Sequence, residues 1–220
     1  MGLSISLDDG RHAGVESIDA FVRAVESLTD YELLGASRCH GWSRLDVVVH
    51  VLGGFQEMLA GMASPVDSEP TVDAATYWAA FATQYAGDDP VEVVMAQHRR
   101  TAAYAQPAAA TAHLRDVADA TRRGVIALQD RPCLWDGHVF AAGDYLAVWA
   151  VEDVLHHLDL LSEEPAPPSA LTVARATVEA LVDEPLPATW TDLDVTLIGT
   201  GRMPVPVGAG ALADRLPALG

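Results

Sequence analysis

The sequence predicts a mainly α-helical protein with a small α+β region at its C-terminus. Apolar residues recur at three- and four-residue spacing through most of residues 15–161, which is the pattern of amphipathic helices. Several prolines at 163–169 then end the last long helix, because proline has no backbone N–H and cannot continue it. We therefore divide the chain into a helical bundle at 1–164 and a C-terminal α+β region at 165–220.

Two helices are predicted in the N-terminal part of the chain. Apolar side chains at helical spacing place the first over residues 15–34. The second covers about residues 45–62 and follows Ser43 and Asp46, an S-x-x-D capping box in which each side chain satisfies a free backbone N–H. Ser43 is therefore expected to be the N-cap of the second helix.

Further helix signals follow in the middle of the chain. Thr71 or Asp73 can cap a helix through residues 74–87. Asp89 followed by Pro90 is the pattern of an N-cap with proline at the first helical position. We expect one helix before Asp89 and another after it.

The second half of the bundle contains the most helix-like segment. Pro107 is expected to interrupt or kink the chain, and an alanine-rich helix then continues to about Gln129. Residues 129–144 form a connection with a short extended piece. The helix that follows begins at about Ala142 or Asp144 and ends at Leu161, which completes the bundle.

The C-terminal region is predicted to contain both helix and strand. Residues 170–182 have helical spacing, and residues 192–208 alternate with period two around a Gly-Thr-Gly turn, which is typical of a β-hairpin. Residues 211–216 are expected to form a last short helix.

Composition excludes some classes of partner. The formal net charge is −18, from 31 acidic and 13 basic residues, and every basic residue is arginine. A surface with this excess of acid does not favour binding to nucleic acid. The start of the chain lacks a cationic segment followed by an apolar one, and no charge-free apolar stretch approaches the roughly 18 residues of a membrane span. We expect a cytoplasmic protein that does not bind membranes.

The two cysteines, Cys39 and Cys133, are too few for a disulfide framework or a cysteine-rich zinc site. We interpret both as reduced, largely buried thiols. Cys39 precedes the capping serine by four residues, which is too far for a strong effect of the helix dipole on its pKa. The tryptophans assigned to the core rather than to a pocket are Trp78, Trp135, Trp149 and Trp190.

A group of candidate metal ligands lies on the second helix and on the last helix of the bundle. Glu152 and His156 are four residues apart, so on a helix they share one face and can reach one divalent ion. His50, in the middle of the second helix, is the candidate third ligand. Asp46 and Asp159 lie one turn from the histidines, and either can hold a ligand ring by its other N–H, unless Asp46 is occupied by capping.

The same residues have plainer explanations. Each histidine alone is more often a hydrogen-bonded core or surface residue than a metal ligand, and the pattern E-x-x-x-H is weak by itself. His157 adjoins His156, and the periodicity does not choose which of the two faces inward. The residues alone therefore leave the metal site open.

Two segments, "GWSRLDVVVHVLGG" and "YLAVWAVEDVLHHLDL", together resemble the mycothiol-dependent maleylpyruvate isomerase family. In that family a Gly-Trp-Ser/Thr helix start leads to a histidine, and a later helix reads Glu-x-x-x-His-x-x-Asp-Leu. The resemblance covers about residues 11–162, and the C-terminal tail matches less specifically. The matching residues here are Gly41, Trp42, Ser43, His50, Glu152, His156, Asp159 and Leu160.

The resemblance implies a DinB-like four-helix bundle with His50, Glu152 and His156 as ligands of a divalent metal. The metal is usually zinc, with nickel or iron as alternatives, and mycothiol is the co-substrate. Asp159 and Asp46 would then support the ligand rings. The activity implied is that of an isomerase or a thiol transferase acting on a small electrophilic or unsaturated acid.

Other interpretations stay open at this point. A metal-dependent hydrolase of the same fold would use the same ligands, and a non-catalytic binding or stress-response module would keep the bundle without the chemistry. Arg202 can bind a substrate carboxylate if the C-terminal hairpin folds over the mouth of the bundle, because guanidinium binds carboxylates in bidentate fashion. Otherwise it is a solvated turn residue. Homo-oligomers that pair through an apolar helix face are possible, and no feature of the sequence selects an oligomeric state.

Overall fold

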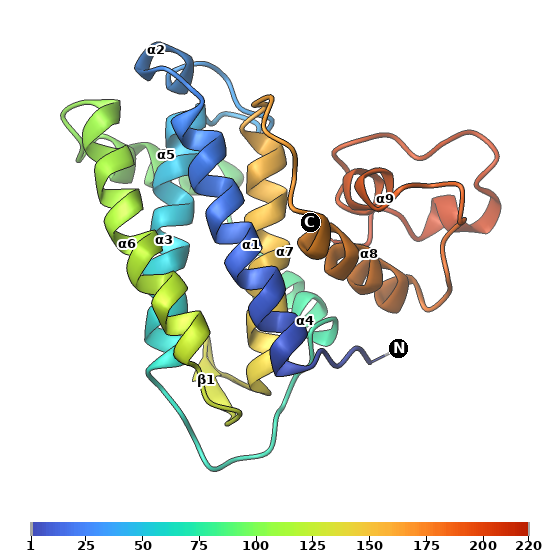
Figure 1. Ribbon diagram of the computed structural model, residues 1–220. Coiled ribbons are helices and arrows are strands. Elements are labelled where there is room, and N and C mark those ends of the chain that lie inside the picture. Colours follow the sequence, from blue (N-terminus) through green and yellow to red (C-terminus); the bar gives the residue numbers. More distant parts are fainter. Residues whose placement is uncertain (1, 220) are drawn as a thin grey trace.

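Four long helices, α1, α3, α6 and α7, lie side by side and form a bundle (Figure 1). A computed structural model describes residues 2–219. The mainly helical fold that the sequence predicts is confirmed. The bundle helices are α1 (Leu7–Glu26), α3 (Arg44–Met62), α6 (Pro107–Ala127) and α7 (Ala142–Asp159).

Shorter elements connect the bundle helices. They are α2 (Asp30–Leu33), α4 (Thr76–Gln84), α5 (Pro90–Thr101), β1 (Cys133–Trp135) and β2 (His138–Phe140). The two strands are antiparallel, with Leu134 opposite Val139, and provide the short extended piece expected before α7. Asp89 and Pro90 start α5 as predicted, and Pro107 starts α6.

The first helix differs from its predicted range of 15–34. Helix α1 begins at Leu7 because the Ser6 hydroxyl accepts the backbone N–H of Asp9 and caps it. The helix ends at Glu26, and a separate short helix follows behind its own capping box at Thr29. The predicted start was too late and the predicted end ran two helices together.

Helix α7 is buried along nearly its whole length, because α1, α3 and the later helix α8 (Pro168–Val182) pack around it. It approaches α1 closely where Gly10 faces Gly143. A Cβ on Gly10 would lie 2.7 Å from the Gly143 carbonyl oxygen, so this crossing requires glycine. Such contacts hold α7 at a fixed depth in the bundle.

The C-terminal region is helical and lies beside the bundle (Figure 1). The hairpin predicted for 192–208 is wrong: the segment begins with a helix whose capping box is Thr191 and Asp194 and whose buried face includes Val195 and Ile198. The described part of this region contains no strand. Its elements are α8 (Pro168–Val182), α9 (Asp192–Gly199) and a 3₁₀ helix (Gly210–Asp214).

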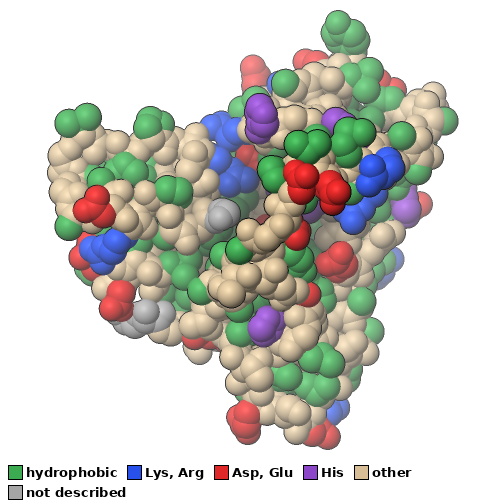
Figure 2. Space-filling view, turned by 180° about the vertical axis from the view of Figure 1, so that it is seen from behind, with side chains coloured by type: hydrophobic (Ala, Val, Ile, Leu, Met, Phe, Trp, Pro, Cys, Tyr) green, Lys and Arg blue, Asp and Glu red, His purple; other side chains and the backbone are tan. Residues whose placement is uncertain are grey.

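The surface reflects the acidic composition. Figure 2 shows acidic side chains scattered over one face and the C-terminal region as a lobe beside the bundle. Helix α3 is long and apolar enough to cross a membrane by length and composition, but 56% of that window is buried in the bundle. A core helix passes the same test, so α3 is weak evidence for a membrane span.

Candidate metal centre

Three side chains from two facing helices meet at one point. His50 comes from the middle of α3, and Glu152 and His156 come from successive turns of α7. His50 Nε2 lies 3.3 Å from Glu152 Oε1, and His156 Nε2 lies 3.1 Å from the same oxygen. The two imidazole rings are 4.6 Å apart between centroids. The structure therefore brings together the three residues that the sequence singled out.

This donor set suits a divalent metal. One ligand atom from each of His50, Glu152 and His156 lies within 4.8 Å of the other two. Two imidazole nitrogens and a carboxylate oxygen are the ligands of many catalytic zinc sites, where three protein ligands leave one position for a reactant. The histidine that the periodicity left undecided is also settled, since the His157 Nε2 faces the Glu164 carbonyl oxygen, 3.0 Å away.

Opposite charges determine how these groups ionise. Burial opposes ionisation of Glu152, but the imidazoles of His156 and His50 outweigh it and hold the pKa of Glu152 well below its usual value. Burial likewise opposes a charge on His156, yet Glu152 and Asp159 raise its pKa well above the usual value. A metal ion bound here would therefore displace a proton from His156.

Asp159 lies behind His156 and joins the C-terminal region to the site. Its Oδ2 is 3.2 Å from His156 Nδ1, and its two oxygens accept hydrogen bonds from Arg202 Nε at 2.8 Å and Nη2 at 2.6 Å. The Cys39 thiol also donates to Oδ2, at 3.1 Å. Burial opposes ionisation of Asp159, but Arg202 and His156 outweigh it and lower its pKa. The carboxylate is thus charged and held between two cations.

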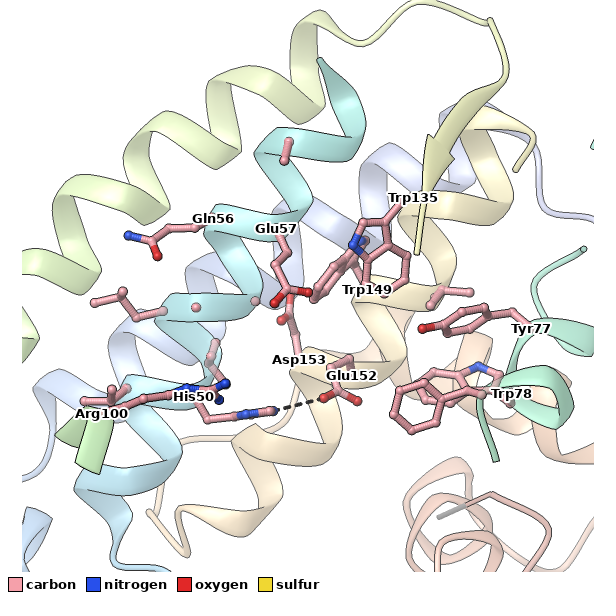
Figure 3. Close-up of a pocket in the computed structure, with 18 of the residues that line it drawn as sticks. His50, Gln56, Glu57, Tyr77, Trp78, Arg100, Trp135, Trp149, Glu152 and Asp153 are labelled. Atoms are coloured by element: carbon pink, nitrogen blue, oxygen red, sulfur yellow. Dashed lines mark hydrogen bonds and ion pairs between the residues drawn. The ribbon is translucent and has the colours of Figure 1, made fainter. Parts of the chain in front are cut away.

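A large cavity opens on the other side of the ligand cluster. Its volume is about 910 Å³, and His50 and Glu152 line it together with Asp153, Gln56 and Arg100. Figure 3 shows Tyr77 and Trp78 on the opposite side of Glu152 from His50 and Arg100. The remaining aromatic side chains in the lining are Phe81, Tyr104, Trp135 and Trp149. A cavity of this size accommodates ligands of drug size.

The sequence matches the family described as Mycothiol maleylpyruvate isomerase N-terminal domain, over residues 15–161. This stretch is more than half of the chain and contains His50, Glu152 and His156. The chain belongs to this family. Among proteins whose function has been curated, none matches it significantly.

Two solved structures have a fold similar to that of this mycothiol maleylpyruvate isomerase family member. The crystal structure of the mycothiol-dependent maleylpyruvate isomerase superposes with a TM-score of 0.57 at 14% identity, covering 79% of this chain and 70% of that one. A histidine-to-alanine mutant of that isomerase gives 0.54 at 13% identity with the same coverage. The mainly α, DinB-like bundle predicted from the sequence is confirmed.

The two aspartates predicted to support the ligand rings of this family member have different surroundings. Asp46 Oδ2 accepts hydrogen bonds from the Ser43 N–H at 2.8 Å and the Ser43 hydroxyl at 2.6 Å, so it caps α3. His98 Nε2 lies 3.6 Å from the same oxygen. Asp159 is the carboxylate that faces the ring of a candidate ligand, His156. Of the two roles considered for Asp46, the structure shows capping.

Arg202 reaches the site by a different route from the one expected. The C-terminal region does approach the bundle, but the guanidinium of Arg202 is bound to Asp159 and its side chain is only 17% exposed. Arg202 is also not among the residues that line the cavity. It is neither a solvated turn residue nor, in this structure, free to bind a substrate carboxylate.

Sequence reasoning missed several residues around the centre. Trp149 is in the core and Trp78 and Trp135 pack against it, as predicted, but all three also line the cavity. Cys39 is half-buried beside Asp159 rather than simply enclosed in the core. Trp149 lies on α7, one turn before Glu152. Trp78 on α4, Trp135 on β1 and Cys39 in the loop before α3 are brought beside the site only by the tertiary fold, so no spacing rule connects them to α7.

Proposed function

We propose that this protein is a metal- and thiol-dependent enzyme. His50, Glu152 and His156 would hold a divalent ion, zinc in preference to nickel or iron. Mycothiol would be the co-substrate and a small electrophile or unsaturated acid the substrate. The observation that carries the proposal is the convergence of both Nε2 atoms on one Glu152 oxygen, at the wall of the large cavity.

The chemistry follows from this position. A bound divalent ion lowers the pKa of a thiol beside it, so that the thiol reacts as a thiolate at neutral pH. Addition of thiolate sulfur to a conjugated cis double bond leaves a single bond that rotates, and expulsion of the same thiolate restores the double bond as trans. In a transferase the carbon–sulfur bond remains, and the adjacent carbon takes up a proton.

The residues of the chain have separate tasks in this scheme. His50 and Glu152, which are 31% and 29% exposed, line the cavity and would hold the ion at its wall, where a thiol can reach it. His156, 10% exposed, completes the donor set from the buried side. Asp159 fixes the orientation of the His156 ring because Arg202 holds the carboxylate in place.

Metal content is the first test. Purified wild-type protein, loaded with zinc and freed of excess ion, is expected to retain about one ion per chain by mass spectrometry. The double substitution Glu152→Ala and His156→Ala should lose it, and so should His50→Ala. The exposed histidine variant His12→Ala is the control and should keep the ion. Full retention by the ligand variants, or no binding by the wild type, would refute the metal site.

Thiol dependence is the second test. The loaded protein is incubated with an unsaturated acid or an electrophile, with and without mycothiol, and products are followed by chromatography. We expect conversion only when both metal and thiol are present. Conversion by hydrolysis without thiol would favour the metal-dependent hydrolase instead. The cytoplasmic location stays a prediction from the sequence.

A further inference from the structure

The walls of the cavity are unusually rich in aromatic side chains. Phe81 is 39% exposed, although large apolar side chains in a folded protein are usually covered. Trp78 and Trp135 are only half-buried. Apolar surface gathered around a cavity and left uncovered is typical of a ligand site. The six aromatic side chains in the lining are Tyr77, Trp78, Phe81, Tyr104, Trp135 and Trp149.

The charges in the lining disfavour an anionic ligand among these rings. Arg100 is the only arginine or lysine among the described residues that line the cavity, and it lies beside His50, away from Tyr77 and Trp78. The acidic side chain of Glu57 is also in the lining. A dicarboxylate lying among these rings would lose water from its charges while the guanidinium and His50 lie at the other end of the cavity, which is unfavourable without a partner for each charge.

The arrangement in Figure 3 separates a reactive end from an apolar end. Glu152 and His50 mark the reactive end, and the rings of Tyr77, Trp78 and Trp135 lie beyond Glu152. A ligand that places its electrophilic carbon near Glu152 on this side therefore extends its remaining atoms between aromatic faces. Uncharged aromatic groups gain both apolar burial and ring stacking there.

We infer that the substrate of this site is an uncharged, aromatic electrophile rather than a small dicarboxylic acid such as maleylpyruvate. The inference rests on the proposed thiol chemistry and specifies the class of molecule that receives the thiol. In the transferase form of the reaction the sulfur bonds to the electrophilic carbon. The thiol proton moves to the neighbouring carbon in an addition, or leaves with the displaced group in a substitution.

Equilibrium binding of unreactive probes tests the inference without turnover. N-phenyl-1-naphthylamine is the uncharged probe, and naphthalene-2,6-dicarboxylate is the charged one, each followed by its own fluorescence and by quenching of tryptophan. We expect the uncharged probe to bind at least about tenfold more tightly to the full chain, with or without zinc. Equal or tighter binding of the dicarboxylate would overturn the inference.

Gly53 offers a variant that fills the cavity without disturbing the fold. It lines the cavity, and a Cβ built on it meets nothing within 4 Å. Because glycine is also a poor helix former, Gly53→Leu should fold normally while its side chain occupies part of the cavity. We expect it to weaken binding of the uncharged probe by at least about tenfold, and unchanged binding would overturn the inference.

Phe81→Ala should also weaken binding of the uncharged probe, since it removes an exposed ring from the lining. Tyr31→Ala is the matched control, because Tyr31 is an aromatic residue on α2 that is 85% exposed and does not line the cavity. Steady-state kinetics with mycothiol then show whether the rings bind the electrophile or the thiol. A Phe81→Ala increase in KM for the thiol alone would assign the ring to the thiol and overturn the inference.

Failure of this inference and failure of the proposed function give different results. If the protein holds no metal, the thiol mechanism fails, while probe binding still reports on the cavity. If metal and thiol dependence are established but only dicarboxylates bind and react, the mechanism stands and the aromatic substrate class is wrong.

Discussion

The two sides of the ligand cluster are built differently. Behind His156 lies a buried group of charges, in which Asp159 is 1% exposed and bound by Arg202. In front of Glu152 lies a cavity with aromatic walls. Buried charges in a hydrogen-bonded network fix the positions of side chains, whereas apolar walls accept ligands of varied shape. Under the proposed function, one side would position the candidate ligands and the other would receive the reactants.

The largest effect is expected from breaking the charged side. Asp159→Ala leaves the guanidinium of Arg202 without its carboxylate, which should lower the free energy of unfolding by about 3–5 kcal/mol in urea denaturation. Because Asp159 also faces His156 Nδ1, zinc affinity should fall about 10- to 100-fold.

A surface ion pair provides the control for this substitution. Asp67 is 92% exposed and pairs with Arg131 at 2.8 Å. Asp67→Ala should change the free energy of unfolding by less than about 1 kcal/mol. If the two variants lose the same stability, the buried network does not have the role assigned to it.

A second prediction concerns Asp153, the buried acid next to Glu152. Burial raises the pKa of Asp153 to about 8, and the Ser17 hydroxyl 3.1 Å away only partly offsets this. The unfolded group ionises near pH 4, so between about pH 4 and pH 8 the folded state binds more protons and stability falls as pH rises.

Asp153→Asn should therefore reduce the fall in the free energy of unfolding with rising pH. For one group this fall reaches about 1.4 kcal/mol per pH unit. Unfolding of metal-free wild type and variant is compared across that pH range in the presence of a chelator. Asparagine retains an acceptor for Ser17, so the hydrogen bond is preserved. Parallel stability curves for the two proteins would show that Asp153 ionises normally.

The smallest effect is expected on the cavity side. Arg100 is exposed at the lining, so Arg100→Gln should change the free energy of unfolding by less than about 0.5 kcal/mol. Binding of N-phenyl-1-naphthylamine should be unaffected, because the rings and not the guanidinium contact an uncharged ligand. A clear loss of stability would show that Arg100 belongs to the structural side of the site.

Local patterns in the sequence predicted the parts of the site that lie within single helices. Glu152 and His156 share a face because four residues make about one helical turn, and the capping box at Ser43 fixed the start of α3. The pairing of Arg202 with Asp159 spans 43 residues and depends on how the C-terminal region packs, which no local pattern encodes.

The C-terminal helix shows why an alternating pattern misleads. Residues 192–199 fit a period of two, but Val195 and Ile198, three residues apart, are the buried positions of a helix. Thr191 and Asp194 form the same kind of capping box as Ser43 and Asp46, and this signal predicts a helix there. The cavity was not predicted because, apart from Trp149 on α7, its aromatic residues come from α4, β1 and the segment after α5, which only the tertiary fold brings together.

The ion pair between Arg202 and Asp159 makes the bundle depend on the C-terminal region. A fragment ending at Ser162 would keep all three candidate ligands, yet its Asp159 would have lost the guanidinium that binds both oxygens. Arg38, whose Nε is 4.0 Å from Asp159, would be the arginine that remains. The positive charge that balances Asp159 in the bundle is therefore supplied by Arg202, which belongs to the C-terminal region. Cutting the chain among the prolines at 165–168 would therefore change the surroundings of the candidate ligand His156, because the cut removes the distant Arg202.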